Sequence, residues 1–83
     1  MRGTKYKPVW VVGSTCQCRD EEGHPMKFNT GFSIKAWFET HDPDFTRVLF
    51  TSQKRAKQYA EGLRLNICLV LCAHPEVQGG ANA

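Results

Sequence analysis

The chain has 83 residues, 41% of them hydrophobic, and its 11 basic and 8 acidic residues give a formal charge of +3. A chain this short buries only about two thirds of the surface that its unfolded form exposes, which excludes barrels and doubly wound sheets with deep substrate pockets. No apolar run reaches the roughly 18 residues of a membrane-spanning helix. The apolar run Val9 to Val12 is too short for a signal-peptide core. We therefore expect a cytoplasmic protein, with one domain at residues 1–77 and a flexible C-terminal tail at residues 78–83.

The first half of the chain predicts two strands joined by a turn. β-branched and aromatic residues after Pro8 predict a strand over residues 9–19. Apolar and polar residues then alternate from Met26 to Glu39, the period of a strand with one apolar face. A bulge or turn at Asn29-Thr30-Gly31 would divide this segment into two shorter strands. In either case we expect antiparallel pairing through the turn at residues 20–24.

The segment from residue 42 to residue 64 has two interpretations. In the first, residues 47–50 form a short strand, and Ser52 caps a helix that runs through Glu61 and stops at Gly62. In the second, Asp42 caps one long helix with Pro43 in its first turn. The β-branched and aromatic residues of this segment favour the first interpretation. They are Thr46, Val48, Phe50 and Thr51.

The helix after Ser52 is amphipathic, and the last strand is not. The helix has an apolar stripe that must lie on the sheet, made of Ala56, Tyr59, Ala60 and Leu63. Residues 65–73 are apolar on both faces, which predicts a central strand covered on both sides. The expected fold is therefore α+β: an antiparallel sheet of three to four strands with one helix on one face, in the order strand, strand, short strand, helix, strand.

One short helix covers one face of such a sheet, so the other face lacks cover. The acidic loop at residues 39–46, a second copy of the chain in a homodimer, or a different macromolecule would supply it. Candidate partner-binding residues lie on the predicted polar side of the second strand and in two acidic clusters. They are Lys27, Lys35, Trp37, Asp20, Glu21, Glu22, Asp42 and Asp44.

The sequence contains no strong catalytic or cofactor motif. The four cysteines, Cys16, Cys18, Cys68 and Cys72, are candidate zinc ligands or disulfide partners. Each pair falls within a predicted strand rather than on a metal-binding turn, so buried thiols are the favoured interpretation. We expect no enzymatic activity, no cofactor and no small-molecule substrate.

Nucleic acid is a second partner class. Four basic residues of the helical half of the chain, Lys54, Arg55, Lys57 and Arg64, are candidate phosphate contacts. Four lysines could also share a sheet surface with Trp37 and Tyr6, as in proteins that bind single strands. These lysines are Lys5, Lys7, Lys27 and Lys35.

Residues 50–72 resemble a strand–turn–helix–strand unit of small phage and mobile-element proteins. The residues that carry this resemblance are Phe50-Thr51-Ser52, Ala56, Tyr59-Ala60, Leu63 and the strand from Leu65 to Cys72. Among these proteins are anti-CRISPR proteins, which are compact α+β domains that block a nuclease or surveillance complex by occupying a surface. The resemblance implies a non-enzymatic inhibitor in the host cytoplasm. The alternatives are a nucleic-acid-binding regulator and a zinc-stapled interaction module.

Overall fold

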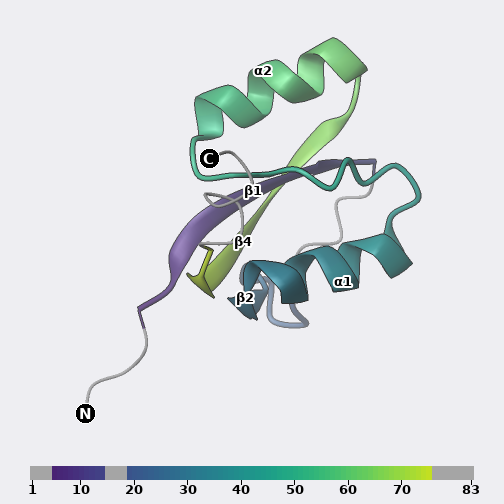
Figure 1. The fold of residues 1–83 in the computed structure, drawn as a ribbon. Helices are drawn as coiled ribbons and strands as arrows, with labels where there is room; N and C mark the ends of the chain where they lie inside the picture. The colour runs from purple at the N-terminus through teal and green to yellow at the C-terminus, as the bar shows by residue number, and fades with distance from the viewer. Residues whose placement is uncertain (1–4, 15–18, 76–83) are drawn as a thin grey trace.

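The computed structural model describes residues 5–14 and 19–75, which form a four-stranded sheet and two helices (Figure 1). In chain order the elements are β1 Lys7–Gly13, β2 Lys27–Thr30, α1 Gly31–His41, β3 Leu49–Phe50, α2 Gln53–Leu63 and β4 Asn66–His74. The α+β class is confirmed. The expected single helix and wholly antiparallel sheet are wrong, because there are two helices and the sheet is mixed.

The strand order is β2-β4-β1-β3. β1 pairs antiparallel with β4, with Val9 opposite Val70, and antiparallel with β3, with Trp10 opposite Phe50. β2 pairs parallel with β4, with Lys27 beside Leu71. The central position predicted for the last strand is therefore correct, whereas the antiparallel pairing of the first two strands is wrong, since β3 and β4 occupy both edges of β1.

The predicted turn at residues 20–24 is present even though the hairpin around it is not. The N–H of Asp20 donates to the carbonyl of His24 at 2.8 Å, and the N–H of Gly23 donates to the carbonyl of Asp20 at 3.0 Å. Arg19 and Pro25 form an isolated antiparallel bridge beside this turn. β1 ends at Gly13, and the predicted continuation over residues 15–18 lies outside the described residues.

Residues 31–41 form helix α1, so the second strand predicted from Met26 to Glu39 is wrong after Thr30. Thr30 caps the helix, because its hydroxyl accepts the N–H of Ser33 at 3.1 Å. Ile34 and Phe38, four positions apart, are buried, whereas Phe32 is 68% exposed. Residues at positions i and i+4 lie on the same face of a strand and also on the same face of a helix, so the spacing of Ile34 and Phe38 fits both structures.

The strand-then-helix interpretation of the next segment is correct. Ser52 caps α2 by accepting the N–H of Arg55 at 3.3 Å. The helix runs past Gly62 and ends at Leu63, and Arg64 adopts the left-handed conformation with φ 60°. Asp42 follows α1 as its C-cap, so the alternative long helix starting at Asp42 is wrong.

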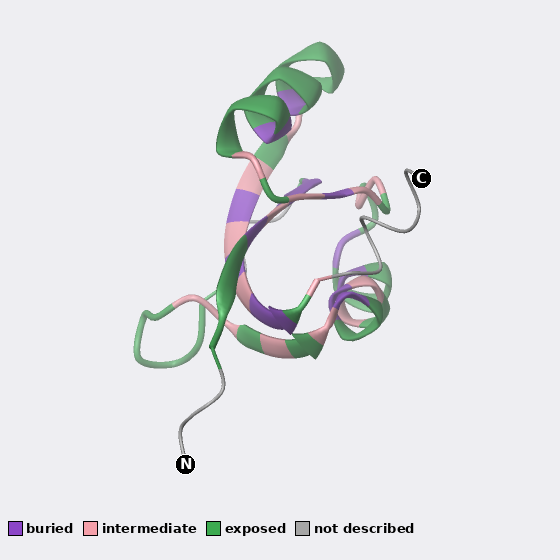
Figure 2. Cartoon of the chain, turned by 60° about the vertical axis from the view of Figure 1, so that its left-hand side comes forward, coloured by how far each residue is buried: buried purple, intermediate pink, exposed green. Residues whose placement is uncertain are grey.

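The two helices lie on opposite faces of the sheet. Because β3 and β4 are both antiparallel to β1 and β2 is parallel to β4, strands β2, β3 and β4 all run in one direction. The connection through α1 crosses the sheet one way, and the connection through α2 crosses back. Right-handed crossovers in opposite directions place their helices on opposite faces. Figure 2 shows the sheet curving around α1, with α2 at one end of the sheet.

Each helix packs on its own apolar cluster. Ile34 and Phe38 of α1 join the larger cluster, whose strand residues are Val9, Val11, Leu49, Cys68, Val70 and Cys72. Ala56 and Ala60 of α2 pack on Val12, with Trp10, Phe50, Leu65 and Ile67 at the periphery. The face expected to lack cover is therefore covered by α1, which formed from the segment interpreted as a strand.

Candidate functional site

The two faces of the sheet differ sharply in burial. On the face toward α1, the six strand residues of the larger cluster are at most 4% exposed. On the face toward α2, only Val12 and Ala73 are buried among the strand residues, while Trp10, Phe50, Ile67, Leu69 and Leu71 are partly exposed and Pro8 is exposed. The α2 face is therefore covered over only part of its length.

The placement of α2 and its small buried side chains account for this difference, since both helices have 11 residues. α2 lies at one end of the sheet (Figure 2) and packs on it with Ala56 and Ala60, whereas α1 packs on its face with Ile34 and Phe38. Leu69 and Leu71 belong to neither apolar cluster. We call the part of this face beyond the α2 cluster the open half-face and define it by Tyr6, Pro8, Trp10, Leu69 and Leu71, of which Trp10 also packs against that cluster.

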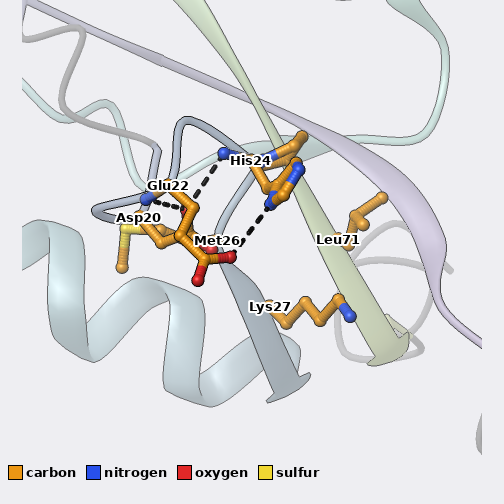
Figure 3. Close-up of a pocket in the computed structure, with 7 residues that line it drawn as sticks. Asp20, Glu22, His24, Met26, Lys27 and Leu71 are labelled. Atoms are coloured by element: carbon orange, nitrogen blue, oxygen red, sulfur yellow. Dashed lines mark hydrogen bonds and ion pairs between the residues drawn. The ribbon is translucent and has the colours of Figure 1, made fainter.

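A hollow of about 660 Å³ borders the open half-face at Leu71 (Figure 3). Its lining comes from the turn at residues 20–24, the start of β2 and the end of β4. The lining residues are Asp20, Glu22, His24, Pro25, Met26, Lys27 and Leu71. The hollow thus combines an apolar floor with charged groups of both signs.

The acidic turn at the hollow is held by its own backbone. One carboxylate oxygen of Asp20 accepts the N–H of His24 at 3.0 Å and that of Glu22 at 2.9 Å. The hydrogen bond from the His24 N–H is the main reason that the pKa of Asp20 lies below its ordinary value of 3.8. The ring Nδ1 of His24 lies 3.6 Å from a carboxylate oxygen of Glu22. Both carboxylates therefore have partners within the turn.

Lys27 lies on the open side of the sheet. Its register partner is Leu71, so the two side chains share a face. The Nζ atom lies 5.4 Å from the centroid of the Tyr6 ring, a cation–π distance. Figure 3 shows the Lys27 side chain extending from β2 across β4. Among the described residues, no carboxylate lies within ion-pair distance of Lys27.

The structure brings together only some of the predicted partner-binding residues. Asp20, Glu22 and Lys27 line one hollow, and Glu21 lies in the same exposed turn. Lys35 and Trp37 lie on α1, beyond the opposite face of the sheet. The sheet surface predicted to hold Lys27, Lys35 and Trp37 together is therefore wrong.

Trp37 packs against other rings at the edge of the larger cluster. Its ring stacks on that of His41, with centroids 3.9 Å apart, and meets Phe28 edge-on at 6.4 Å. The Trp37 ring therefore has a packing role on α1, and the predicted position on the polar side of a strand is wrong.

Asp42 is a structural residue rather than part of an exposed acidic loop. It is 3% exposed, and its carboxylate accepts the Ser14 hydroxyl at 2.8 Å, the Ser14 N–H at 3.1 Å and the Asp44 N–H at 3.0 Å. A Cβ atom at Gly13 would overlap this carboxylate. Asp42 thus joins the end of α1 to the end of β1, while Asp44 is exposed.

The basic residues of the second half do not form one site. Lys54, Arg55, Lys57 and Arg64 are exposed, and Lys54 and Lys57 line a shallow hollow on α2. Within the described ranges, none of the four has a carboxylate at ion-pair distance. Their role in binding nucleic acid stays a prediction.

The cysteines that the structure describes are buried in the core. Cys68 and Cys72 lie in the larger apolar cluster. Four residues apart on one strand, they are separated by about 13 Å, too far for one zinc ion with Zn–S bonds of about 2.3 Å. Cys16 and Cys18 lie outside the described residues. Over residues 5–14 and 19–75, no three His, Cys, Asp or Glu side chains gather as a metal site.

Trp10, Leu69 and Leu71 are not among the residues predicted for the site, although a strand that is apolar on both faces indicates that both faces need cover. The sequence predicts that the face opposite the helix after Ser52 lacks cover. In the structure α1 covers that face, and the partly exposed residues lie on the α2 face instead.

Comparisons of this chain with protein-family models, with curated proteins and with solved structures find no match. None of the helices in the described part of the chain is long and apolar enough to span a membrane.

Proposed function

We propose that this protein is a non-enzymatic binding protein that covers a surface of a macromolecular partner with its open half-face. The observation that carries the proposal is the difference in burial between the two sheet faces. Large apolar residues left exposed next to each other commonly mark interaction surfaces. Trp10, Leu69 and Leu71 are partly exposed and lie on the same face as the exposed Tyr6 ring, whereas the strand residues that face α1 are buried.

The hollow beside the open half-face supports the same proposal. It provides charged groups at the rim of an apolar surface, the usual arrangement of interfaces with a polar periphery. Action as an inhibitor by occlusion, as implied by the resemblance over residues 50–72, is part of this proposal and rests on that resemblance. A cytoplasmic location belongs to the same expectation.

Site-specific photo-cross-linking tests the proposal with a matched pair of positions. Benzoylphenylalanine replaces Tyr6 on the open half-face in one variant and Phe32 on α1 in the other. Both are exposed aromatic residues, at 41% and 68%, and they lie on opposite sides of the sheet. Irradiation in cells of the natural host should yield an adduct from position 6 and none from position 32. Equal adducts from both positions, or none from position 6, would overturn the proposal.

A further inference from the structure

We propose that the occupant of the open half-face is a single-stranded nucleic acid. This inference rests on the proposed function and names the chemical class of the partner. A surface that binds a single strand needs exposed aromatic rings on which bases stack and basic side chains that contact phosphates, and both must lie on one continuous surface. Each requirement is met by residues on the α2 side of the sheet.

The rings come from the N-terminal part of the chain. Tyr6 is 41% exposed and Trp10 is partly exposed. Lys27, which faces the same side as Leu71, contacts the Tyr6 ring, and Trp10 is opposite Leu69 in the adjacent strand. The two rings therefore lie on one face, separated by about 13 Å along the chain. Pro8 lies between them without a large side chain to block access.

The cations stand at two ends of this surface. Lys27 lies beside Leu71 on β2. Lys57 of α2 lines a hollow with Glu61 and with Ile67, which precedes Leu69 on the same face of β4. Among the described residues, neither ammonium group has a carboxylate within ion-pair distance. Their charge complements phosphate groups that run across the face from β2 to α2.

Asp20 and Glu22 line the same hollow as Lys27, but among the described residues neither carboxylate lies within ion-pair distance of the Lys27 ammonium group. The Asp20 carboxylate accepts hydrogen bonds from backbone N–H groups of its own turn, and a Glu22 carboxylate oxygen lies 3.6 Å from the His24 ring. A protein partner would have to supply acidic groups to match Lys27 and Lys57. Nucleic acid supplies such charge at every nucleotide. Because bases in a duplex are stacked inside, flat rings on a sheet select a single strand.

Fluorescence anisotropy with labelled 20-nucleotide oligouridine and oligothymidine measures this binding directly. Tyr6→Ala should weaken binding about 5- to 150-fold, the range for loss of one stacking ring. Lys27→Gln should weaken binding and reduce the slope of log K against log salt by about 0.7, the value for one phosphate contact on a single strand. The matched controls are Phe32→Ala and Lys35→Gln on α1, which should leave affinity and slope unchanged.

Intrinsic fluorescence gives a second readout at the surface itself. In a Trp37→Phe background, Trp10 is the remaining tryptophan of the chain. Stacking of a base on this ring should quench its emission upon addition of unlabelled oligonucleotide. Circular dichroism of each variant checks that the fold is retained.

The possible outcomes separate this inference from the proposed function. Absence of oligonucleotide binding at low salt, together with a protease-sensitive adduct from position 6, would make the partner a protein; the inference would fall and the proposed function would stand. Binding that is lost in Lys54→Glu but unchanged in Tyr6→Ala would move the contact to the outer surface of α2 and overturn the inference. Absence of both binding and adduct would remove both.

Discussion

Replacement of Asp42 by alanine should strongly destabilise the fold, although the sequence suggests an exposed acidic residue. The Asp42 carboxylate is buried, and among the described residues its donors are the N–H and hydroxyl of Ser14 and the N–H of Asp44. Hydrogen bonds to a charged group contribute about 1.5–3 kcal/mol each. Because Ser14 and Asp44 are exposed, water replaces part of this loss. We expect a decrease of about 2–4 kcal/mol in the free energy of unfolding.

Urea denaturation followed by tryptophan fluorescence measures this change. A domain of this size has a total stability of about 4–12 kcal/mol, so the loss is a large fraction of it. With a urea m-value of about 1 kcal/mol/M, the midpoint should fall by about 2 M or more. The control is Asp44→Ala, which changes a neighbouring exposed acid and should stay within about 0.5 kcal/mol of the parent. Equal midpoints for Asp42→Ala and Asp44→Ala would refute the structural role of the carboxylate.

The same contact can be tested from the strand side. Ser14→Ala removes one donor and should cost about 1 kcal/mol. Gly13→Ala places a methyl group against the Asp42 carboxylate and should cost about 1–3 kcal/mol. In an Asp42→Ala background the cost of Gly13→Ala should shrink, since the overlapping group is gone. Additive effects of these two changes would contradict the packing described for Gly13 and Asp42.

Three further predictions test helix α1, helix α2 and the acidic turn. Phe38→Ala should lower the free energy of unfolding by about 3–5 kcal/mol and Phe32→Ala by less than about 0.5 kcal/mol, because only the first ring is buried; equal losses would favour the strand interpretation. Gly62→Ala should raise stability by about 0.5–1 kcal/mol in chemical denaturation, because it lies inside α2 with open space around it. NMR titration should give Asp20 a pKa below 3.8, since the His24 N–H stabilises its charged form. The stabilisation from this group is present above the unfolded-state pKa and is lost as the pH falls through the folded-state pKa, so Asp20→Asn should remove that part of the acid sensitivity.

The helices, strands and turns that could be predicted are those that depend on residues close together in the sequence. A capping serine before an apolar stripe predicts α2, and Ser52 provides the capping contact. A run that is apolar on both faces predicts a central strand, and β4 lies between β1 and β2. The turn at residues 20–24 follows from Asp20, whose carboxylate accepts N–H groups of the turn, and from Gly23, which adopts a positive φ of 88°.

Residues 31–41 could not be assigned in this way because two periods coincide there. Ile34 and Phe38 are four apart and share a face in a strand and in a helix alike. The exposure of Phe32 distinguishes the two, and that exposure is a property of the folded chain. The predicted site was wrong for the same reason. Lys35 and Trp37 belong to α1 and therefore lie on the opposite side of the sheet from Lys27.

The sequence by itself determined the α+β class, the central β4, helix α2 and the excess of apolar surface over available helix. Tertiary structure alone decided which face of the sheet stays open. In the strand order β2-β4-β1-β3, the two connections between parallel strands cross in opposite directions, and their right-handedness places α1 and α2 on opposite faces. α1 closes its face with Ile34 and Phe38, while α2, which has the same length, packs with Ala56 and Ala60 on Val12 and leaves Leu69 and Leu71 partly exposed. The handedness of the crossovers and the placement of α2, rather than composition, therefore set which face stays open.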